Sequence, residues 1–244
     1  MRHYFVSTMN MKLYSKYGKD LLDSYVETEQ GLPMIVYVED EIKNYPPYNN
    51  VTFVNLFAHK PELKKFLDRN AKKEVPGFLK DARRFSYKVF AQCDGARFGE
   101  KMYYIDADSI FTKRIPEPWY EQCLPDDCLI AFYYREGLYT ETGFIAFNTK
   151  HNMAKSFFQF YEGLYITDKV YNLENWTDCH TFDFTRKKIR VQMDYHTNKL
   201  GDGGKGHIMA RDTFLNPYID HRKGKRKFQK HSPEWLRMTR ARNA

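Results

Sequence analysis

The sequence lacks any long hydrophobic run. Its longest apolar stretches, such as Leu129–Tyr134 and Phe144–Phe147, are much shorter than the roughly 18 apolar residues that a membrane-spanning helix needs. The first eight residues contain no extended apolar segment of the kind found in secretory signal peptides. We therefore expect no transmembrane segment, no secretion signal and a cytoplasmic location.

Cysteine is also scarce. The 244 residues include four cysteines, with no Cys-x-x-Cys pair and no spacing typical of a zinc site. We expect free thiols, which excludes a small disulfide-stabilised scaffold. Hydrophobic residues make up 42% of the chain and charged residues 29%, which are ordinary proportions for a globular protein and exclude extensive disorder.

Most of the chain lacks an excess of charge of either sign. Residues 221–244 contain nine Lys or Arg residues and one acid, Glu234, so this segment accounts for the whole net charge of +8. The neutral remainder is not a basic surface built for nucleic acid. We expect one domain over residues 1–220 and a basic C-terminal segment over residues 221–244, which favours an anionic partner.

Apolar runs typical of buried strands alternate with segments that have helical periodicity. The expected strands are Tyr4–Ser7, Met34–Val38, Val51–Phe57, Lys101–Ile105, Cys128–Tyr134 and Thr142–Asn148. The expected helices cover residues 18–28, 62–92 with an interruption at 75–77, 153–165 and a stretch after Trp176, and we expect a loop around Pro116 and Pro118. This alternation predicts an α/β fold with a mostly parallel central sheet flanked by helices.

Two carboxylates directly follow one of these strands. The segment Asp106-Ala107-Asp108 comes after the apolar run Lys101–Ile105. Ligands of open α/β sheets bind outside the carboxyl ends of the strands, and side chains at positions i and i+2 leave the backbone on the same side. Asp106 and Asp108 are therefore candidate ligands of one divalent cation, which could also contact a nucleotide diphosphate.

A second motif lies in the basic segment. His221, Gly224 and Lys227 have the spacing His-x-x-Gly-x-x-Lys. A neutral imidazole is a common metal ligand, a glycine lets a phosphate approach the backbone, and a lysine ammonium pairs with phosphate. A histidine in a run of basic residues can also be an ordinary surface residue.

Together the two motifs resemble those of GT-A glycosyltransferases, in particular the retaining family of glycogenin and the bacterial lipopolysaccharide galactosyltransferases. The resemblance implies a GT-A, Rossmann-like fold and a Mn²⁺ or Mg²⁺ ion held by Asp106, Asp108 and His221. A shell of imidazole, carboxylate and phosphate suits manganese better than calcium. The donor-binding positions implied within the two motifs are Ala107, Gly224 and Lys227, with Lys227 on the diphosphate.

Other positions resemble the family less closely. Relatives carry a basic residue that contacts the donor on the helix before the Asp-x-Asp motif, and here that position is Lys88 or Arg84. Asp178 matches the first position of an Asp-Gln-Asp motif, although Cys179 replaces the glutamine. The resemblance implies catalytic roles for Asp178 and Lys88, but an aspartate there can also be a plain helix N-cap.

The sugar and nucleotide positions also follow from the resemblance. Gly143 matches the glycine of an Asn-Ala-Gly strand that lines the sugar pocket, with Glu141 or Thr140 in place of the asparagine. In relatives, a turn after the first strand holds an acid and an aromatic residue that stacks on uracil. The corresponding nucleotide-binding positions in this chain are Thr8, Asn10, Tyr14, Glu39 and Asp40, where Glu39 or Asp40 would accept the N–H of the base.

These expectations describe a Mn²⁺-dependent hexosyltransferase. It would move a sugar from a nucleotide-diphosphate donor, expected to be a UDP-sugar, to an unknown acceptor with retention of configuration. Small members of this kind occur in bacteria and tailed phages, so the cytoplasm would be that of a bacterium or of an infected host cell. One alternative is a phosphohydrolase of the haloacid dehalogenase type, which also uses a strand followed by Asp-x-Asp. The other is a nucleic-acid-binding protein that acts through the basic segment.

Overall fold

The protein is built around one seven-stranded sheet. The computed structural model describes residues 2–192, 196–204 and 206–242. The sheet has the order β3-β2-β1-β4-β7-β6-β8. Its strands are β1 (His3–Met9), β2 (Met34–Val38), β3 (Val51–Asn55), β4 (Lys101–Ile105), β6 (Cys128–Tyr133), β7 (Glu141–Asn148) and β8 (His196–Leu200). Neighbouring strands are parallel except where β7 pairs with β4 and β6. The prediction of a mostly parallel α/β sheet is confirmed.

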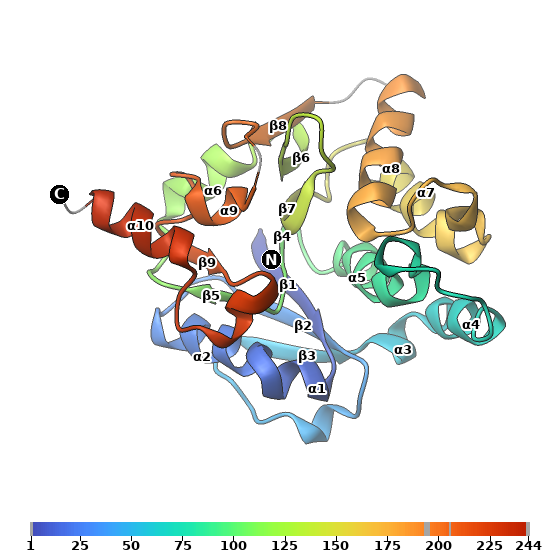
Figure 1. Cartoon of the computed structure of the whole chain (residues 1–244), viewed down its shortest axis with the longest axis horizontal. Helices are drawn as coiled ribbons and strands as arrows, with labels where there is room; N and C mark the ends of the chain where they lie inside the picture. The colour runs from blue at the N-terminus through green and yellow to red at the C-terminus, as the bar shows by residue number, and fades with distance from the viewer. Residues whose placement is uncertain (1, 193–195, 205, 243–244) are drawn as a thin grey trace.

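Helices cover both faces of this sheet, as Figure 1 shows. One face is covered by α4 (Pro61–Arg69), α5 (Ala82–Gly95), α7 (Ala154–Ile166) and α8 (Asp178–Gln192). The other is covered by α2 (Lys19–Glu27), α6 (Glu117–Cys123) and α9 (Ile208–Arg211). The remaining α-helices are α1 (Met11–Leu13), α3 (Leu56–His59) and α10 (Pro233–Arg242). Within the described residues, no helix is both long and apolar enough to cross a bilayer.

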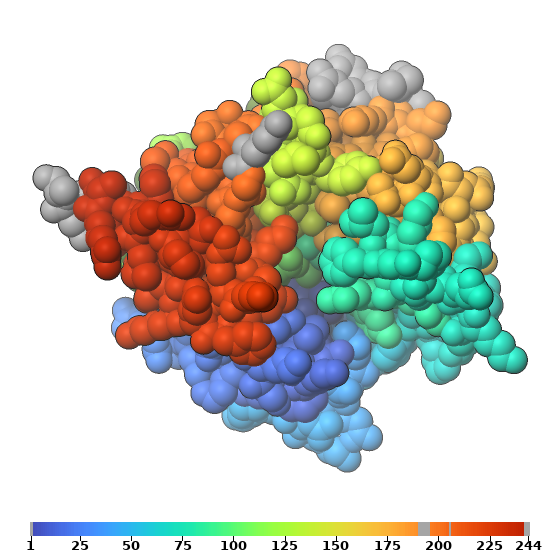
Figure 2. Space-filling view, in the orientation of Figure 1, coloured from blue at the N-terminus to red at the C-terminus, as the bar shows by residue number. Residues whose placement is uncertain are grey.

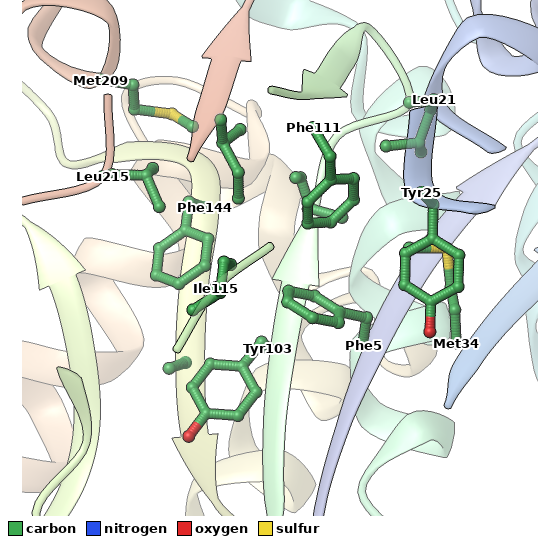
Figure 3. Close-up of a cluster of buried hydrophobic side chains, with 14 of the residues drawn as sticks. Phe5, Leu21, Tyr25, Met34, Tyr103, Phe111, Ile115, Phe144, Met209 and Leu215 are labelled. Carbon is green, nitrogen blue, oxygen red and sulfur yellow. The ribbon is translucent and has the colours of Figure 1, made fainter. Parts of the chain in front are cut away.

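Alternating strand residues supply two separate hydrophobic cores. In β4, Tyr103 and Ile105 belong to the core beneath α2 and α6, whereas Met102 and Tyr104 belong to the core beneath α5 and α7. Figure 3 shows the first core, in which rings from strands and helices pack against one another. Each fully buried large side chain of this kind contributes about 1.5–3 kcal/mol to folding. The two cores hold β4 firmly, and β4 carries the two aspartates at its end.

Two local expectations were wrong. The stretch around Pro116 and Pro118 contains α6 instead of a loop, because a proline in the first helical turn needs no N–H partner and has a suitable φ. The third strand ends at Asn55 and not at Phe57. The Asn55 side chain accepts a hydrogen bond of 2.8 Å from the Ala58 N–H and so caps α3.

The basic C-terminal segment folds back onto the body of the protein. Strand β9 (Ile219–His221) pairs in antiparallel fashion with β5 (Ser109–Phe111), which follows the Asp-x-Asp motif. A 3₁₀ turn (Gly224–Phe228) and α10 complete the segment. The expected boundary at residues 220 and 221 lies within β9, which joins the segment to the body.

Candidate active site

Both aspartates of the Asp-x-Asp motif lie at the carboxyl edge of the sheet. Asp106 follows β4, and its backbone N–H donates a hydrogen bond of 2.9 Å to the Gly143 carbonyl of β7. Asp108 leads into β5, where Ser109 lies opposite His221 in the register with β9. The short β5–β9 ladder therefore brings a histidine from the C-terminal segment beside an aspartate more than a hundred residues earlier.

Asp106, Asp108 and His221 form a group that can hold one metal ion. Each offers a ligand atom, and these atoms lie within 4.8 Å of one another. Asp108 and His221 are buried, and His221 Nδ1 is a buried nitrogen without a hydrogen-bond partner among the described residues. Two carboxylates and an imidazole fit Mn²⁺ well, and Mg²⁺ less well because it prefers oxygen ligands. The residues predicted from the two motifs are brought together.

His221 and Asp108 shift each other's pKa in opposite directions. Burial alone would raise the pKa of Asp108, but the neighbouring His221 and Lys227 bring it below its ordinary value. Burial lowers the pKa of His221, and Asp108 more than offsets this, so the pKa of His221 is raised. The Nε2 of His221 lies 3.1 Å from Asp108 Oδ1.

Lys88 connects the aspartates of two different elements. Its ammonium, on α5, lies 2.7 Å from Asp106 Oδ1 and 2.8 Å from Asp178 Oδ2. Burial lowers the pKa of Lys88, but Asp106 and Asp178 more than offset this and hold it well above its ordinary value. Burial raises the pKa of Asp106, whereas Lys88 and a hydrogen bond from Thr142 hold the pKa of Asp178 low despite its burial. Lys88 therefore compensates the charge of one half-buried acid, Asp106, and one buried acid, Asp178.

Asp178 is the first residue of α8, but it is not the helix cap. The side-chain oxygen of Thr177 accepts the hydrogen bond from the His180 N–H at 3.3 Å, which is the usual N-cap interaction. The Asp178 carboxylate instead accepts a hydrogen bond of 2.7 Å from the Thr142 hydroxyl. Its side chain is also directed to Lys88.

Arg84, the other basic candidate on α5, lies elsewhere. It is exposed, and its guanidinium lies over the rings of Phe78 and Phe85 at 5.0 and 6.0 Å from the ring centres. Of the two candidates on this helix, Lys88 contacts the aspartates. Arg84 lies one turn closer to the start of α5, on its exposed side.

Lys227 reaches the site from the 3₁₀ turn that follows β9. Its ammonium lies 2.9 Å from Asp108 Oδ2 and 4.6 Å from the centre of the Tyr17 ring. Gly224 begins the turn with a φ of 67°, which belongs to the left-handed region that favours glycine. Gly224 therefore allows the chain to reverse so that both His221 and Lys227 reach Asp108.

Strand β7 contributes contacts that the sequence did not reveal. Glu141, Thr142 and Gly143 are consecutive, so their side chains alternate between the two faces of the sheet. Glu141 is buried and accepts a hydrogen bond of 2.8 Å from Lys223, while Thr142 contacts Asp178 on the opposite face. Lys223 and His221 offset the burial of Glu141 and lower its pKa to about 2. The signal in the sequence that could have indicated these contacts is Glu141, a charged residue at the start of a mostly apolar strand.

Gly143 packs directly against a metal-binding candidate. A Cβ atom at this position would lie 2.5 Å from His221 Cε1 and 2.9 Å from His221 Nδ1. No side chain fits there without moving the imidazole. Gly143 therefore constrains the position of His221. The expected contact between Gly143 and the sugar stays a prediction.

The nucleotide-binding candidates lie at the ends of β1 and β2, two adjacent parallel strands. Asn10 donates a hydrogen bond of 3.1 Å to Glu39, and its side-chain oxygen caps α1. Burial raises the pKa of Glu39. Tyr14 packs edge-on against Tyr45 at a ring distance of 5.3 Å, so its ring is part of the core.

The three other candidates at this edge have different surroundings. Asp40 accepts hydrogen bonds from the Met11 N–H and from the Tyr45 hydroxyl. The Thr8 hydroxyl is buried and has no partner among the described residues. Ala107 is buried against the core beneath α2. Asn10, Glu39 and Asp40 are thus brought together, and Thr8, near the end of β1, offers an unsatisfied hydroxyl two residues before Asn10.

The surface is hollowed on the face that carries these elements. Figure 2 shows a hollow between the C-terminal segment, in red, and the segment that holds the start of α5, in teal. Blue and green segments from the first half of the chain lie at its base. The hollow separates the two parts of the chain that supply Lys227 and Lys88.

Comparisons with known proteins identify the fold. No protein-family model and no curated protein sequence matches the chain. Mouse xyloside xylosyltransferase 1 has a similar structure, with a TM-score of 0.53 and 11% identity over 82% of this chain and 86% of that chain. The bifunctional glycosyltransferase WbbM is similar with a TM-score of 0.52 and 12% identity, over 98% of this chain and 51% of that chain. The chain has a GT-A-like glycosyltransferase fold. At these identities the likeness concerns the fold alone.

Proposed function

We propose that this protein is a metal-dependent glycosyltransferase that transfers a sugar from a nucleoside-diphosphate donor to an acceptor. The main support is the convergence of Asp106, Asp108 and His221 within 4.8 Å at the carboxyl edge of a glycosyltransferase fold. Ligands of open α/β sheets bind at this edge.

The three ligands would hold a divalent ion, with Mn²⁺ favoured by the mixed imidazole and carboxylate set. When bound, such an ion supplies positive charge that stabilises the departing diphosphate. The β5–β9 ladder fixes His221 relative to Asp108, and the tight packing on Gly143 orients the imidazole. The chain thus preorganises the ligands through backbone pairing and not through long flexible loops.

Two lysines would act on charge at the site. Lysine has a flexible side chain, and its ammonium offers three hydrogen-bond donors. The Lys227 ammonium extends from the turn Gly224–Phe228 to Asp108. It would bind the donor diphosphate and stabilise the negative charge that develops there. Lys88 would keep Asp106 and Asp178 ionised and oriented, since it contacts both carboxylates.

The ends of β1 and β2 would bind the base and ribose of the nucleotide. The hydrogen-bonded pair Asn10 and Glu39 offers both a donor and an acceptor at this edge. These groups suit the imide of uracil, which supports the proposal of a UDP-sugar. We also propose a hexose as the transferred sugar and retention of configuration, both of which rest on the resemblance of the motifs, and a cytoplasmic location.

The phosphohydrolase alternative has less support. Asp106, which would be its nucleophile, follows the fourth strand of the chain, and its Oδ1 accepts a hydrogen bond from Lys88 at 2.7 Å. No feature of the described residues favours this reaction over sugar transfer.

A thermal-shift panel of nucleotide sugars, with and without Mn²⁺, tests the proposed function. Ligand binding stabilises the folded state by about 2.7 kcal/mol at a hundredfold excess over Kd. We expect UDP-sugars to raise the unfolding temperature only when Mn²⁺ is present. Equal shifts without metal, or no shift with any nucleotide sugar, would contradict the proposal.

A further inference from the structure

Six exposed cations lie on the N-terminal and C-terminal segments beside the active site. We call this group the basic ridge, and its members are Lys12, Lys16, Lys225, Lys230, Arg237 and Arg240. All six side chains are exposed, and none of them has a carboxylate partner among the described residues. The proposed sugar transfer uses none of them.

The ridge is assembled from two ends of the chain. The π-helical turn Tyr14–Gly18, which carries Lys16, contacts the 3₁₀ turn Gly224–Phe228, which carries Lys225. The Lys227 ammonium over the Tyr17 ring joins the two turns. In Figure 1, α1, the C-terminal turn and α10 follow one another across the face of the molecule that carries the site. The segments that carry the cations therefore lie along one face of the molecule.

The acids near the ridge are already engaged. Glu234 accepts hydrogen bonds from Arg226, and Asp20 accepts one of 2.8 Å from Arg222. Asp220 is fully buried and is held by Ser232. Since these acids do not neutralise the ridge, it presents a net positive strip that suits a linear polyanion.

An exposed aromatic residue lies among these cations. Phe228 is 76% exposed and directly follows Lys227, which contacts Asp108. Proteins that bind single-stranded nucleic acid combine a positive track for the backbone with aromatic side chains that stack on bases. A duplex keeps its bases stacked inside, so an exposed ring of this kind suits a single strand.

An anionic membrane fits the ridge less well. Interfacial helices bury a broad apolar face in the lipid boundary. In the described part of the C-terminal segment, the large exposed apolar side chains are Phe228 and Leu236. Two separated side chains on different elements do not make such a face.

We propose that the basic ridge binds single-stranded nucleic acid, with Phe228 stacking on a base beside the active site. Lysines of the ridge contact successive phosphates, and the strand passes the mouth of the hollow between the C-terminal segment and α5. This interaction does not depend on the proposed sugar transfer.

Fluorescence anisotropy with a labelled single-stranded oligodeoxynucleotide, measured over a range of salt concentrations, tests the proposal. The ridge variant K12Q/K16Q/K225Q/K230Q should bind at least about tenfold more weakly. The slope of log affinity against log salt should fall by about three, since each phosphate contact with a single strand contributes roughly 0.7. The matched variant K65Q/K155Q/K187Q/K188Q removes the same charge from exposed positions on α4, α7 and α8 and should bind like the wild type.

Phe228→Ala should weaken single-strand binding roughly tenfold without changing the salt slope, because stacking is not an ionic interaction. Duplex DNA and phosphatidylserine vesicles serve as competing ligands. The proposal is overturned if the single strand does not bind, or if the matched variant loses as much affinity as the ridge variant. It is also overturned if vesicles bind while the oligonucleotide does not, or if Phe228→Ala binds like the wild type. Donor-induced thermal shifts, recorded on the same variants, report separately on the proposed sugar transfer.

Discussion

Two buried lysines hold pairs of carboxylates near opposite ends of β4. Lys101, at the amino end, lies 2.8 Å from Glu121 and 2.6 Å from Asp126. Lys88, beside the carboxyl end, lies at similar distances from Asp106 and Asp178. The side chains of Glu121 and Asp126 are 42% and 77% exposed, whereas those of Asp106 and Asp178 are 29% and 10% exposed. The same arrangement is thus hydrated at one end and enclosed at the other.

The difference shows where charge is available for binding. At the amino end water solvates the acids, and the pKa values of Glu121 and Asp126 are lowered by Lys101. At the carboxyl end the acids depend on protein partners, and one of them belongs to the candidate metal group. Enclosed, compensated charge of this kind is typical of binding sites, whereas the hydrated arrangement mainly supports the fold.

Substituting Lys88 and Lys101 in turn should show the largest difference between the two ends of β4, as a loss in the free energy of unfolding. Lys88→Met leaves Asp106 and Asp178 without their buried cation, and we expect the free energy of unfolding to fall by about 3–5 kcal/mol. Lys101→Met leaves two solvated acids and should cost less than half as much. Urea denaturation of both variants measures the two costs, and equal losses would show that the enclosure has no energetic consequence.

Removing one acid at each end separates activity from folding. Asp108→Asn should reduce Mn²⁺-dependent hydrolysis of a UDP-sugar by about a hundredfold or more, because it removes a metal ligand and the partner of Lys227. Asp126→Asn changes the same chemical group at the amino end and should leave hydrolysis unchanged. Full activity of Asp108→Asn would refute the metal assignment.

The buried histidines at the two ends offer a third comparison. His221→Ala should weaken Mn²⁺ binding by at least about 10–100-fold in a calorimetric titration, because the loss of a direct ligand should cost no less than the loss of a group that only supports a ligand. His3 is also buried, but it contacts Glu121 and Tyr103 at the amino end. His3→Ala should therefore leave the titration unchanged. An unaltered titration of His221→Ala would exclude the imidazole from the site.

The smallest expected effect is that of substituting two tightly packed glycines, Gly143 and Gly95. A Cβ at Gly143 would meet the His221 ring, whereas a Cβ at Gly95 would meet Met102 Sδ at 2.8 Å and Val6 Cγ2 at 3.2 Å. Both alanine substitutions should lower the free energy of unfolding by about 1–3 kcal/mol through overpacking. Only Gly143→Ala should also weaken Mn²⁺ binding, since it alone moves a candidate ligand. Unchanged binding in that variant would show that the imidazole relaxes freely.

The sequence predicted the strands best where apolar runs are continuous. Residues Met34–Val38 and Lys101–Ile105 form strands with the expected bounds because strands buried on both faces are apolar throughout. Strands β5 and β9 have three residues each, which is too short for a detectable pattern. The C-terminal residues Pro233–Arg242 were expected as part of a basic tail, since their many cations concealed α10.

The candidate site was predictable only in part for a related reason. Asp106, Asp108 and His221 came from local motifs, and the structure brings them together. The contacts of Lys88 with both acids, and of Glu141 with Lys223, join elements that are distant in the sequence. Local patterns carry no signal for such pairs, because the pairing depends on how the strands are ordered in the sheet.

Crystals grown with Mn²⁺ and UDP would test the central claim most directly, by anomalous scattering near the manganese absorption edge. The account predicts one strong anomalous peak within coordination distance of Asp106, Asp108 and His221. A peak bound by other residues, or a nucleotide bound at this edge of the sheet with no peak between the two aspartates and the imidazole, would contradict it.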